Sequence, residues 1–229
     1  MKAVVLSSGG LDSTTCLAIA VNKFGAQNVA ALSIFYGQRN AAELNAARAV
    51  ADFYKVTRYE LDAAEIFSHS KSAMLAASTE SLEKGSYAAQ MSKNNSPQIS
   101  TYVPFRNGLM ISIAASFAYD LCEDVLDLYV GIHADDAAEA AYADCRADFV
   151  AAMSAAIRIG TYEKIRLIAP FLCQKKSDVV KVGLELGVPY ELTRSCYERG
   201  DKPCGQCATC IDRARAFALN GVDDPALKK

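Results

Sequence analysis

The residues with the clearest capacity for chemistry lie near the amino terminus, in the segment Ser8-Gly9-Gly10-Leu11-Asp12-Ser13. This segment follows the apolar run Ala3–Leu6 and precedes a largely apolar stretch over residues 14–20. The pattern predicts a buried strand that turns through two glycines into a helix. Adjacent glycines let backbone N–H groups converge, and the unpaired N–H groups of a helix amino terminus attract anions. The segment therefore predicts a phosphate site.

Three side chains add to this predicted phosphate site. Ser13 and Thr14 supply hydroxyl donors for phosphate oxygens. Asp12 is an anion beside a phosphate, which makes chemical sense if Mg²⁺ lies between the two. The chain contains no Gly-x-x-x-x-Gly-Lys-Ser/Thr sequence, so a Walker A phosphate loop is excluded.

A second group of chemically capable residues lies near the carboxyl terminus, where four of the eight cysteines cluster with C-x7-C-x2-C-x2-C spacing: Cys196, Cys204, Cys207 and Cys210. Four thiolates suit tetrahedral zinc, and an iron–sulfur cluster is the alternative because it also takes four cysteines. A catalytic zinc keeps an open coordination position, so four ligands favour a structural role. The other apolar-flanked cysteines are expected to be small buried residues: Cys16, Cys122 and Cys173.

Charged and amide side chains follow the other predicted strands, where parallel sheets bind their ligands. They fall into three groups: Gln38, Arg39 and Asn40; Arg106 and Asn107; Asp144 and Arg146. Taken singly, Arg39 or Arg106 is more often an exposed or capping side chain, but the repetition of such groups favours a common site. Lys176 opens a predicted helix, where a cation opposes the helix dipole, so a phosphate or carboxylate partner is expected.

Three further residues leave alternatives open. Asp135 and Asp136 suit either magnesium binding or helix capping. His133, just before them, fits a hydrogen-bonded loop histidine better than a catalytic base.

Strand-like and helix-like segments alternate along the chain, which predicts an α/β fold, a parallel sheet with helices on both faces. Strands are expected at 3–6, 29–35, 56–61, 125–130 and 165–168, and later helices at 41–53, 109–119, 146–159 and 176–186. Residues 63–100 are rich in Ser, Lys and Asn with weak periodicity. They predict an excursion from the sheet, either a mobile lid or a solvated insertion.

Length and charge limit the possible functions. The 229 residues fit one α/β domain, 1–229. A net charge of −2 predicts no broad basic surface for nucleic acid and favours a small-molecule substrate. The chain shows neither a secretory signal nor an apolar stretch for membrane insertion, so a cytoplasmic protein is expected.

These motifs together resemble the PP-loop ATP pyrophosphatases, and among them the 7-cyano-7-deazaguanine synthase family, over nearly the whole chain. The resemblance rests on segments 8–13, 36–39 and 103–107, on Tyr142 with 144–146, on Lys176, and on the four-cysteine tail. Asn40 stands where the family usually has His, and Ala143 where it usually has Pro. Neither departure removes a predicted phosphate or zinc ligand. The first bears on a substrate contact at Asn40, and the second bears on the path of the loop before Asp144.

The resemblance implies a cytoplasmic, homodimeric ligase of queuosine biosynthesis that converts 7-carboxy-7-deazaguanine, ammonia and ATP into 7-cyano-7-deazaguanine. It implies an adenine nucleotide α-hydrolase-like, Rossmann-like fold, bound Mg²⁺, and Zn²⁺ in segment 194–213. ATP would be bound by Ser8, Gly9, Gly10, Leu11, Asp12, Ser13 and Thr14. The proposed catalytic residues are Asp12, Ser13, Lys176, Arg106 and Arg146. Substrate contacts are expected from Gln38, Arg39, Arg106, Asn107 and Asp144.

Two alternatives remain from the sequence. Another PP-loop enzyme, of the tRNA thiolase or lysidine synthetase type, would share the glycine loop, although the acidic balance counts against an RNA substrate. A zinc-stabilised module that binds nucleotide without turnover is the non-enzymatic alternative. AMP release in the presence of substrate would distinguish an enzyme from this non-enzymatic module.

Overall fold

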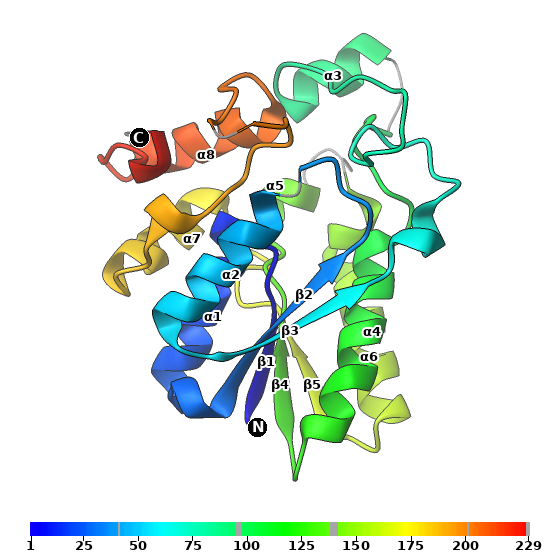
Figure 1. The fold of residues 1–229 in the computed structure, drawn as a ribbon, viewed down its shortest axis with the longest axis vertical. Helices are drawn as coiled ribbons and strands as arrows, with labels where there is room; N and C mark the ends of the chain where they lie inside the picture. Colours follow the sequence, from blue (N-terminus) through cyan, green and yellow to red (C-terminus); the bar gives the residue numbers. More distant parts are fainter. Residues whose placement is uncertain (41, 95–97, 138–141, 201, 228–229) are drawn as a thin grey trace.

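The computed structural model describes residues 1–40, 42–94, 98–137, 142–200 and 202–227. Five strands form a parallel sheet in the order β3-β2-β1-β4-β5 (Figure 1): β1 (Ala3–Leu6), β2 (Val29–Phe35), β3 (Thr57–Asp62), β4 (Leu126–Tyr129) and β5 (Ile165–Ile168). In register, Ala3 pairs with Val29 on one side and with Asp127 on the other. The chain adds β2 and β3 on one side of β1 and then crosses back to add β4 and β5 on the other side. In α/β sheets a ligand crevice opens at such a place, here between β1 and β4, at the carboxyl ends of the strands.

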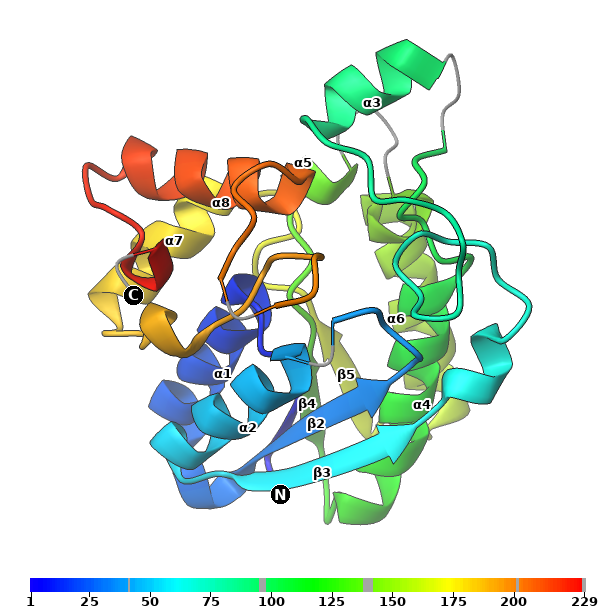
Figure 2. The same cartoon turned by 45° about the horizontal axis from the view of Figure 1, so that its top comes forward.

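Helices cover both faces of the sheet (Figures 1 and 2). One face carries α1 (Leu11–Phe24), α2 (Ala42–Tyr54), α7 (Lys176–Glu185) and α8 (Ala208–Leu219), and the other carries α4 (Arg106–Leu121) and α6 (Ala147–Gly160). The short helices among the described residues are η1 (Ala26–Asn28), η2 (Ala64–Phe67), α3 (Tyr87–Asn94), α5 (Ala134–Ala137), η4 (Ala143–Cys145), η5 (Tyr190–Leu192) and η6 (Pro225–Leu227).

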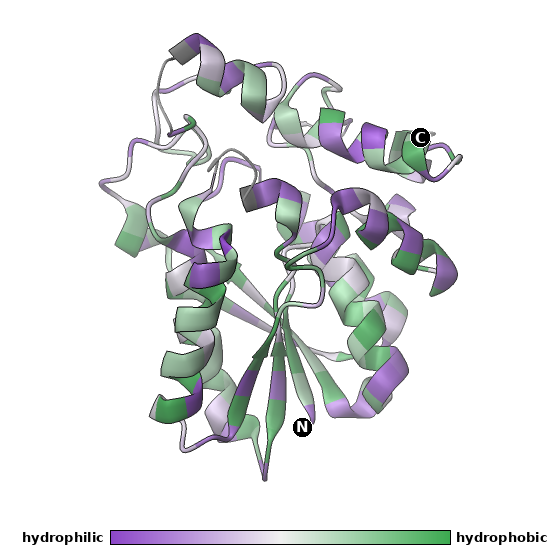
Figure 3. Cartoon of the chain, turned by 180° about the vertical axis from the view of Figure 1, so that it is seen from behind, coloured by the Kyte–Doolittle hydropathy of each residue, from purple (hydrophilic) through white to green (hydrophobic). Residues whose placement is uncertain are grey.

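Burial on both faces of the sheet explains why the central strands β1 and β2 are apolar. Val4 of β1 packs into the core cluster under α4 and α6, whereas Ala3 and Val5 pack into the cluster under α1 and α7, because successive side chains of a strand point to opposite faces. Figure 3 shows hydrophobic residues along most of the strands. The predicted parallel α/β fold is therefore confirmed, and none of the described helices is long and apolar enough to span a membrane.

Element boundaries differ from expectation in one informative place. The helix expected from residue 109 begins at Arg106, directly after Phe105, which has a left-handed φ of 55°. No side chain of a neighbouring residue caps this helix; instead Asp144 Oδ2 accepts a hydrogen bond from Asn107 N at 2.9 Å. Because the cap comes from a distant segment, local capping signals could not mark the helix start.

Segment 63–100 leaves the sheet as predicted and contains α3 and η2. Gly85 N donates to Gln206 O at 3.0 Å, so this excursion touches the four-cysteine segment. The expectation that Cys173 is buried is wrong, because its side chain is exposed, while Cys16 is buried as predicted.

Candidate active site

The glycine loop joins β1 to α1 with a geometry that requires glycine. Gly9 has φ 79°, and a Cβ there would clash with the backbone of Glu43 and Ala47 in the first turns of α2. Gly10 caps α1 without any side-chain acceptor. The amino terminus of α1 thus opens toward a pocket with its dipole uncompensated by a capping side chain, which favours an anion.

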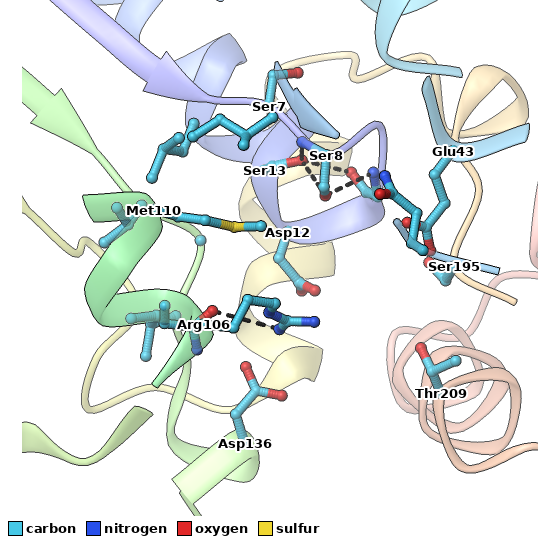
Figure 4. Close-up of a pocket in the computed structure, with 18 of the residues that line it drawn as sticks. Ser7, Ser8, Asp12, Ser13, Glu43, Arg106, Met110, Asp136, Ser195 and Thr209 are labelled. Carbon is cyan, nitrogen blue, oxygen red and sulfur yellow. Dashed lines mark hydrogen bonds between the residues drawn. The ribbon is translucent and has the colours of Figure 1, made fainter. Parts of the chain in front are cut away.

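Serine hydroxyls hold this loop in shape. Ser13 Oγ accepts from Ser8 N at 3.2 Å, the two serine Oγ atoms lie 3.1 Å apart, and Gly10 N donates to Ser8 Oγ at 3.2 Å. Ser8, Gly10 and Ser13 line the pocket (Figure 4). Three other loop residues predicted to bind ATP do not line it. Gly9 packs against the backbone of α2, Leu11 is fully buried in the core, and the Thr14 hydroxyl donates to Gly10 O at 2.7 Å.

Charged side chains gather beside the loop. Asp12 Oδ2 lies 3.5 Å from Lys176 Nζ, while His133 Nε2 lies 3.6 Å from Asp12 Oδ1 and 3.4 Å from Asp136 Oδ2. Burial raises the pKa of Asp136 against the opposing effect of His133. Burial acts to lower the pKa of Lys176, but Asp12 and Asp136 outweigh it and raise that pKa, so the ammonium group stays charged.

The same cluster contains buried polar atoms that protein groups leave unpaired. Within the described residues, Asp12 Oδ1 and both ring nitrogens of His133 are buried without a hydrogen-bond partner. Such atoms are rare in proteins and call for an explanation such as a bound ion. Carboxylate oxygens are the donors that Mg²⁺ prefers, so Asp12 and Asp136 fit this ion.

The two candidates Asp135 and Asp136 separate in the structure. Asp135 Oδ2 accepts from Lys176 N at 2.8 Å and so caps α7, whereas Asp136 lines the pocket. The capping alternative is confirmed for Asp135, although the capped helix is not its own.

The far half of the pocket is aromatic and apolar around one cation. Arg106 Nη1 donates to Tyr36 Oη at 3.2 Å, with the guanidinium over the Tyr36 ring at 5.2 Å from its centroid. Arg106 makes no ion pair within 4.0 Å in the part of the chain that the structure describes. Asn107 and Gln38 line the same half, where Gln38 Oε1 accepts from Tyr36 N at 2.9 Å. Because Arg106 has no anionic partner among the described residues, its guanidinium can bind an anionic group of a ligand.

Three of the residues predicted to act in catalysis or to contact substrate do not line the pocket. Arg39 donates to the carbonyl oxygens of Ser78 and Glu80, and Asp144 is committed to capping α4. Arg146 has a side chain 55% exposed and is paired with Asp148 at 2.7 Å. The structure therefore brings together Asp12, Ser13, Lys176, Arg106, Asn107 and Gln38, and leaves these three apart.

Several lining residues had no assigned role in the sequence. Glu43 lies on the wall opposite Arg106 in Figure 4, and burial raises its pKa to about 8 against the opposing effects of Arg106 and Arg194. Glu43 stands in the polar run after β2, a usable signal. The others come together only through the fold: Tyr87, Tyr142, Arg194, Tyr197 and Thr209.

The four predicted metal ligands meet at one point. Their Sγ atoms all lie within 4.8 Å of one another. Backbone N–H groups of Cys204 and Cys207 donate to the sulfur atoms of Cys196 and Cys204, each at 3.3 Å. Four converging thiols fit a tetrahedral thiolate site for zinc or an iron–sulfur cluster.

This four-cysteine segment, residues 194–213, also touches the glycine loop. Arg194 N donates to Gly9 O at 2.9 Å, and Asn40 Nδ2 donates to Cys196 O at 2.8 Å. Asn40, whose role the sequence left in doubt, therefore joins α2 to the cysteine cluster.

The chain is similar to proteins of known name over almost its full length. A relative from Archaeoglobus fulgidus is 39% identical across 99% of this chain and 90% of its own, and one from Oceanobacillus iheyensis is 37% identical across 98% and 96%. Both are named 7-cyano-7-deazaguanine synthase. A solved structure, the U34-tRNA thiolase NcsA from Methanococcus maripaludis with its 4Fe–4S cluster, matches the fold with a TM-score of 0.50 at 16% identity, over 96% of this chain and 65% of that one.

The family model described as queuosine biosynthesis protein QueC matches residues 2–221. The glycine loop, the arginine-containing aromatic half of the pocket and the cysteine cluster all lie within this match. The chain belongs to the queuosine biosynthesis protein QueC family.

Proposed function

We propose that this protein is an ATP-dependent ligase that converts 7-carboxy-7-deazaguanine and ammonia into 7-cyano-7-deazaguanine. The observation that carries the proposal is the name 7-cyano-7-deazaguanine synthase, borne by relatives that match this chain over nearly its whole length. The pocket supports it, because the glycine loop and Arg106, which has no ion pair among the described residues, face one cavity beside an apolar, aromatic wall. Residues 1–229, including segment 194–213, would act as one synthase domain.

The chemistry explains why a nucleotide is needed twice. A carboxylate is a poor electrophile, because attack adds charge to an anion. Transfer of AMP to a carboxylate oxygen releases pyrophosphate and installs a leaving group, which ammonia displaces to give the amide and AMP. A second AMP transfer, to the amide oxygen, lets that oxygen depart with AMP as the amide loses two protons and the C≡N bond forms.

The residues that line the pocket have distinct roles in this scheme. Ser8, Gly10 and Ser13 would bind the phosphates, and Lys176 would offset charge that develops on them. Arg106 would bind the carboxylate of the acid, with Asn107 and Gln38 as further polar contacts.

Two metals complete the proposal. Asp12 and Asp136 would hold Mg²⁺, which supplies positive charge beside phosphate oxygens. The four cysteines would hold one structural zinc. Purified protein with about one zinc per chain supports this assignment, whereas iron with acid-labile sulfide would contradict it. A homodimer, ammonia supplied either free or by a separate partner, and a cytoplasmic location stay predictions.

Product stoichiometry tests the proposed function. Purified protein is incubated with ATP, Mg²⁺, ammonia and 7-carboxy-7-deazaguanine, and the products are quantified by mass spectrometry. We expect two AMP and two pyrophosphate for each nitrile, and we expect the primary amide to be converted when supplied alone. Release of ADP, or one nucleotide per nitrile, would refute the double transfer of AMP.

A further inference from the structure

Three tyrosines from distant segments meet on one wall of the pocket. The hydroxyl oxygens of Tyr87 and Tyr197 lie 2.7 Å apart, and that of Tyr142 lies 3.3 Å from Tyr197 and 3.4 Å from Tyr87. Thr101 Oγ1 lies 3.0 Å from the Tyr142 hydroxyl. All three tyrosines line the pocket that also holds Arg106. We call Tyr87, Tyr142 and Tyr197 the tyrosine cluster.

The hydrogen-bonding capacity of this cluster exceeds what its members use on one another. Each phenol hydroxyl donates one hydrogen bond and accepts up to two. If each hydroxyl donates to the next one around the cluster, acceptor positions remain on the phenol oxygens. If one hydroxyl rotates, its O–H group can instead donate to a ligand in the pocket. The cluster can therefore pair with either N–H or C=O groups of a ligand.

The surroundings of the cluster suit a flat ring. The Tyr87 and Tyr142 rings pack edge to face with centroids 5.5 Å apart. Apolar side chains line the same cavity: Ile34, Met110, Ile111 and Ile132. An aromatic and apolar wall with a few convergent polar groups is the usual composition of a small-molecule site.

On the basis of the proposed function, we infer that the tyrosine cluster binds the polar edge of the heterocyclic acid through its hydroxyl groups. The ring lactam and the exocyclic amine of 7-carboxy-7-deazaguanine present adjacent N–H and C=O groups, which match hydroxyls that both donate and accept. Arg106 then takes the carboxylate, so the two ends of the substrate contact different groups.

This assignment makes two outlying segments part of the substrate site. Tyr87 belongs to α3, in the excursion over residues 63–100, and Tyr197 directly follows the metal-ligand candidate Cys196. Gly85 N also donates to Gln206 O, so the two segments meet outside the cluster as well. The excursion and the four-cysteine segment thus position substrate as well as stabilising the fold.

Hydroxyl deletion tests the inference. We expect Tyr87→Phe and Tyr197→Phe each to raise the calorimetric Kd for 7-carboxy-7-deazaguanine three- to tenfold, the effect of losing one neutral hydrogen bond. The Kd for a non-hydrolysable ATP analogue and the metal content should stay unchanged. Tyr162→Phe is the matched control, because its ring is 83% exposed. Wild-type affinity for the acid in both cluster variants would overturn the inference.

An analogue identifies which part of the acid the cluster contacts. The acid that lacks the ring oxygen and the exocyclic amine should bind wild type more weakly, and the Tyr87→Phe substitution should then cause no further loss. If Tyr87→Phe weakens binding of this analogue as much as it weakens binding of the acid, the inference is contradicted. Wild-type protein that binds the acid but forms no nitrile would refute the proposed function alone, and protein that binds no acid would refute both.

Discussion

Buried carboxylates at the two ends of the central sheet differ in how completely protein groups pair with them. Near the amino end, Asp127 of β4 is 1% exposed, with Oδ2 3.0 Å from Lys23 Nζ and Oδ1 2.6 Å from Arg166 Nη2. At the carboxyl end, Asp12 Oδ1 is buried with no hydrogen-bond partner in the described residues, although Lys176 lies 3.5 Å from the other oxygen. One carboxylate is fully paired by protein groups, and the other is paired on one side.

This difference separates structural from functional charge. A buried carboxylate whose oxygens are both paired has its desolvation offset within the fold. A buried oxygen left unpaired costs stability and is retained where a ligand or ion completes it. By this criterion the four clustered thiols, like Asp12, are groups that a bound ion completes, since each thiol can become an anionic ligand.

The largest expected effect follows from removing one of these thiols. Cys207→Ser replaces a thiolate with a poor zinc ligand, and metal binding is coupled to folding because the unfolded chain has no preformed site. Apparent zinc affinities of about 10–16 kcal/mol in zinc-finger peptides show the possible scale of this coupling. We expect metal-depleted or aggregated protein, measured by metal analysis and thermal unfolding.

Cys173→Ser is the control for that variant, because Cys173 is exposed and lies outside the cluster. It should keep the metal content and melting temperature of wild type. A Cys207→Ser protein with full metal content and an unchanged melting temperature would show that Cys207 is not a ligand of a metal site coupled to folding.

Asp12→Asn should impair activity more than stability. The substitution keeps the size of the side chain but removes the charge that would hold Mg²⁺, and losing one positioned electrostatic contact costs about 10²–10³ in turnover. Ser13→Ala should give a similar loss through its phosphate contact. Steady-state AMP release measures both, with thermal unfolding to show that each variant is folded. Asp52→Asn, at a side chain 78% exposed, is the control; wild-type turnover in Asp12→Asn would exclude the proposed role.

Asp127→Asn should show the reverse pattern. It leaves Lys23 and Arg166 without their anion, but both side chains are more than half exposed and can be hydrated. We therefore expect a loss of about 1–3 kcal/mol in the free energy of unfolding, with turnover per folded molecule unchanged. Urea unfolding and AMP release measure the two quantities. A large loss of turnover at unchanged stability would contradict the assignment of a structural role to Asp127 and a functional role to Asp12.

The sequence predicts the inner part of this site better than the outer part. The strands 3–6 and 29–35 were located residue by residue, because strands buried on both faces of a parallel sheet need continuous apolar runs. The strand 165–168 also matches its predicted bounds, although Arg166 is exposed. The glycine loop was visible because its function requires consecutive residues. The tyrosine cluster has no such signal, since Tyr87 and Tyr197 are far apart in sequence and meet only after α3 and the cysteine segment fold together.

Helix α8 was missed for a related reason. Its first turn contains Cys210, so metal-ligand spacing masked the helical pattern of residues 208–219. Asp144 was predicted to bind substrate from its polar surroundings, and it instead caps α4. A polar residue near a strand end can serve the backbone or a ligand, and only the position of its partner distinguishes the two.

The smallest expected effect concerns Arg146, which the sequence placed among the catalytic residues. Its guanidinium pairs with Asp148 at the surface, and exposed ion pairs contribute about 0.2–1 kcal/mol. Arg146→Ala should therefore reduce turnover by no more than about threefold, whereas Arg106→Ala, which removes a cation that lines the pocket, should raise the KM for the acid far more. Steady-state kinetics with the acid varied at saturating ATP compares the two variants. An equal rise in both would mean that Arg146 reaches the substrate during turnover, because its surface pair with Asp148 is weak enough to exchange for a substrate carboxylate.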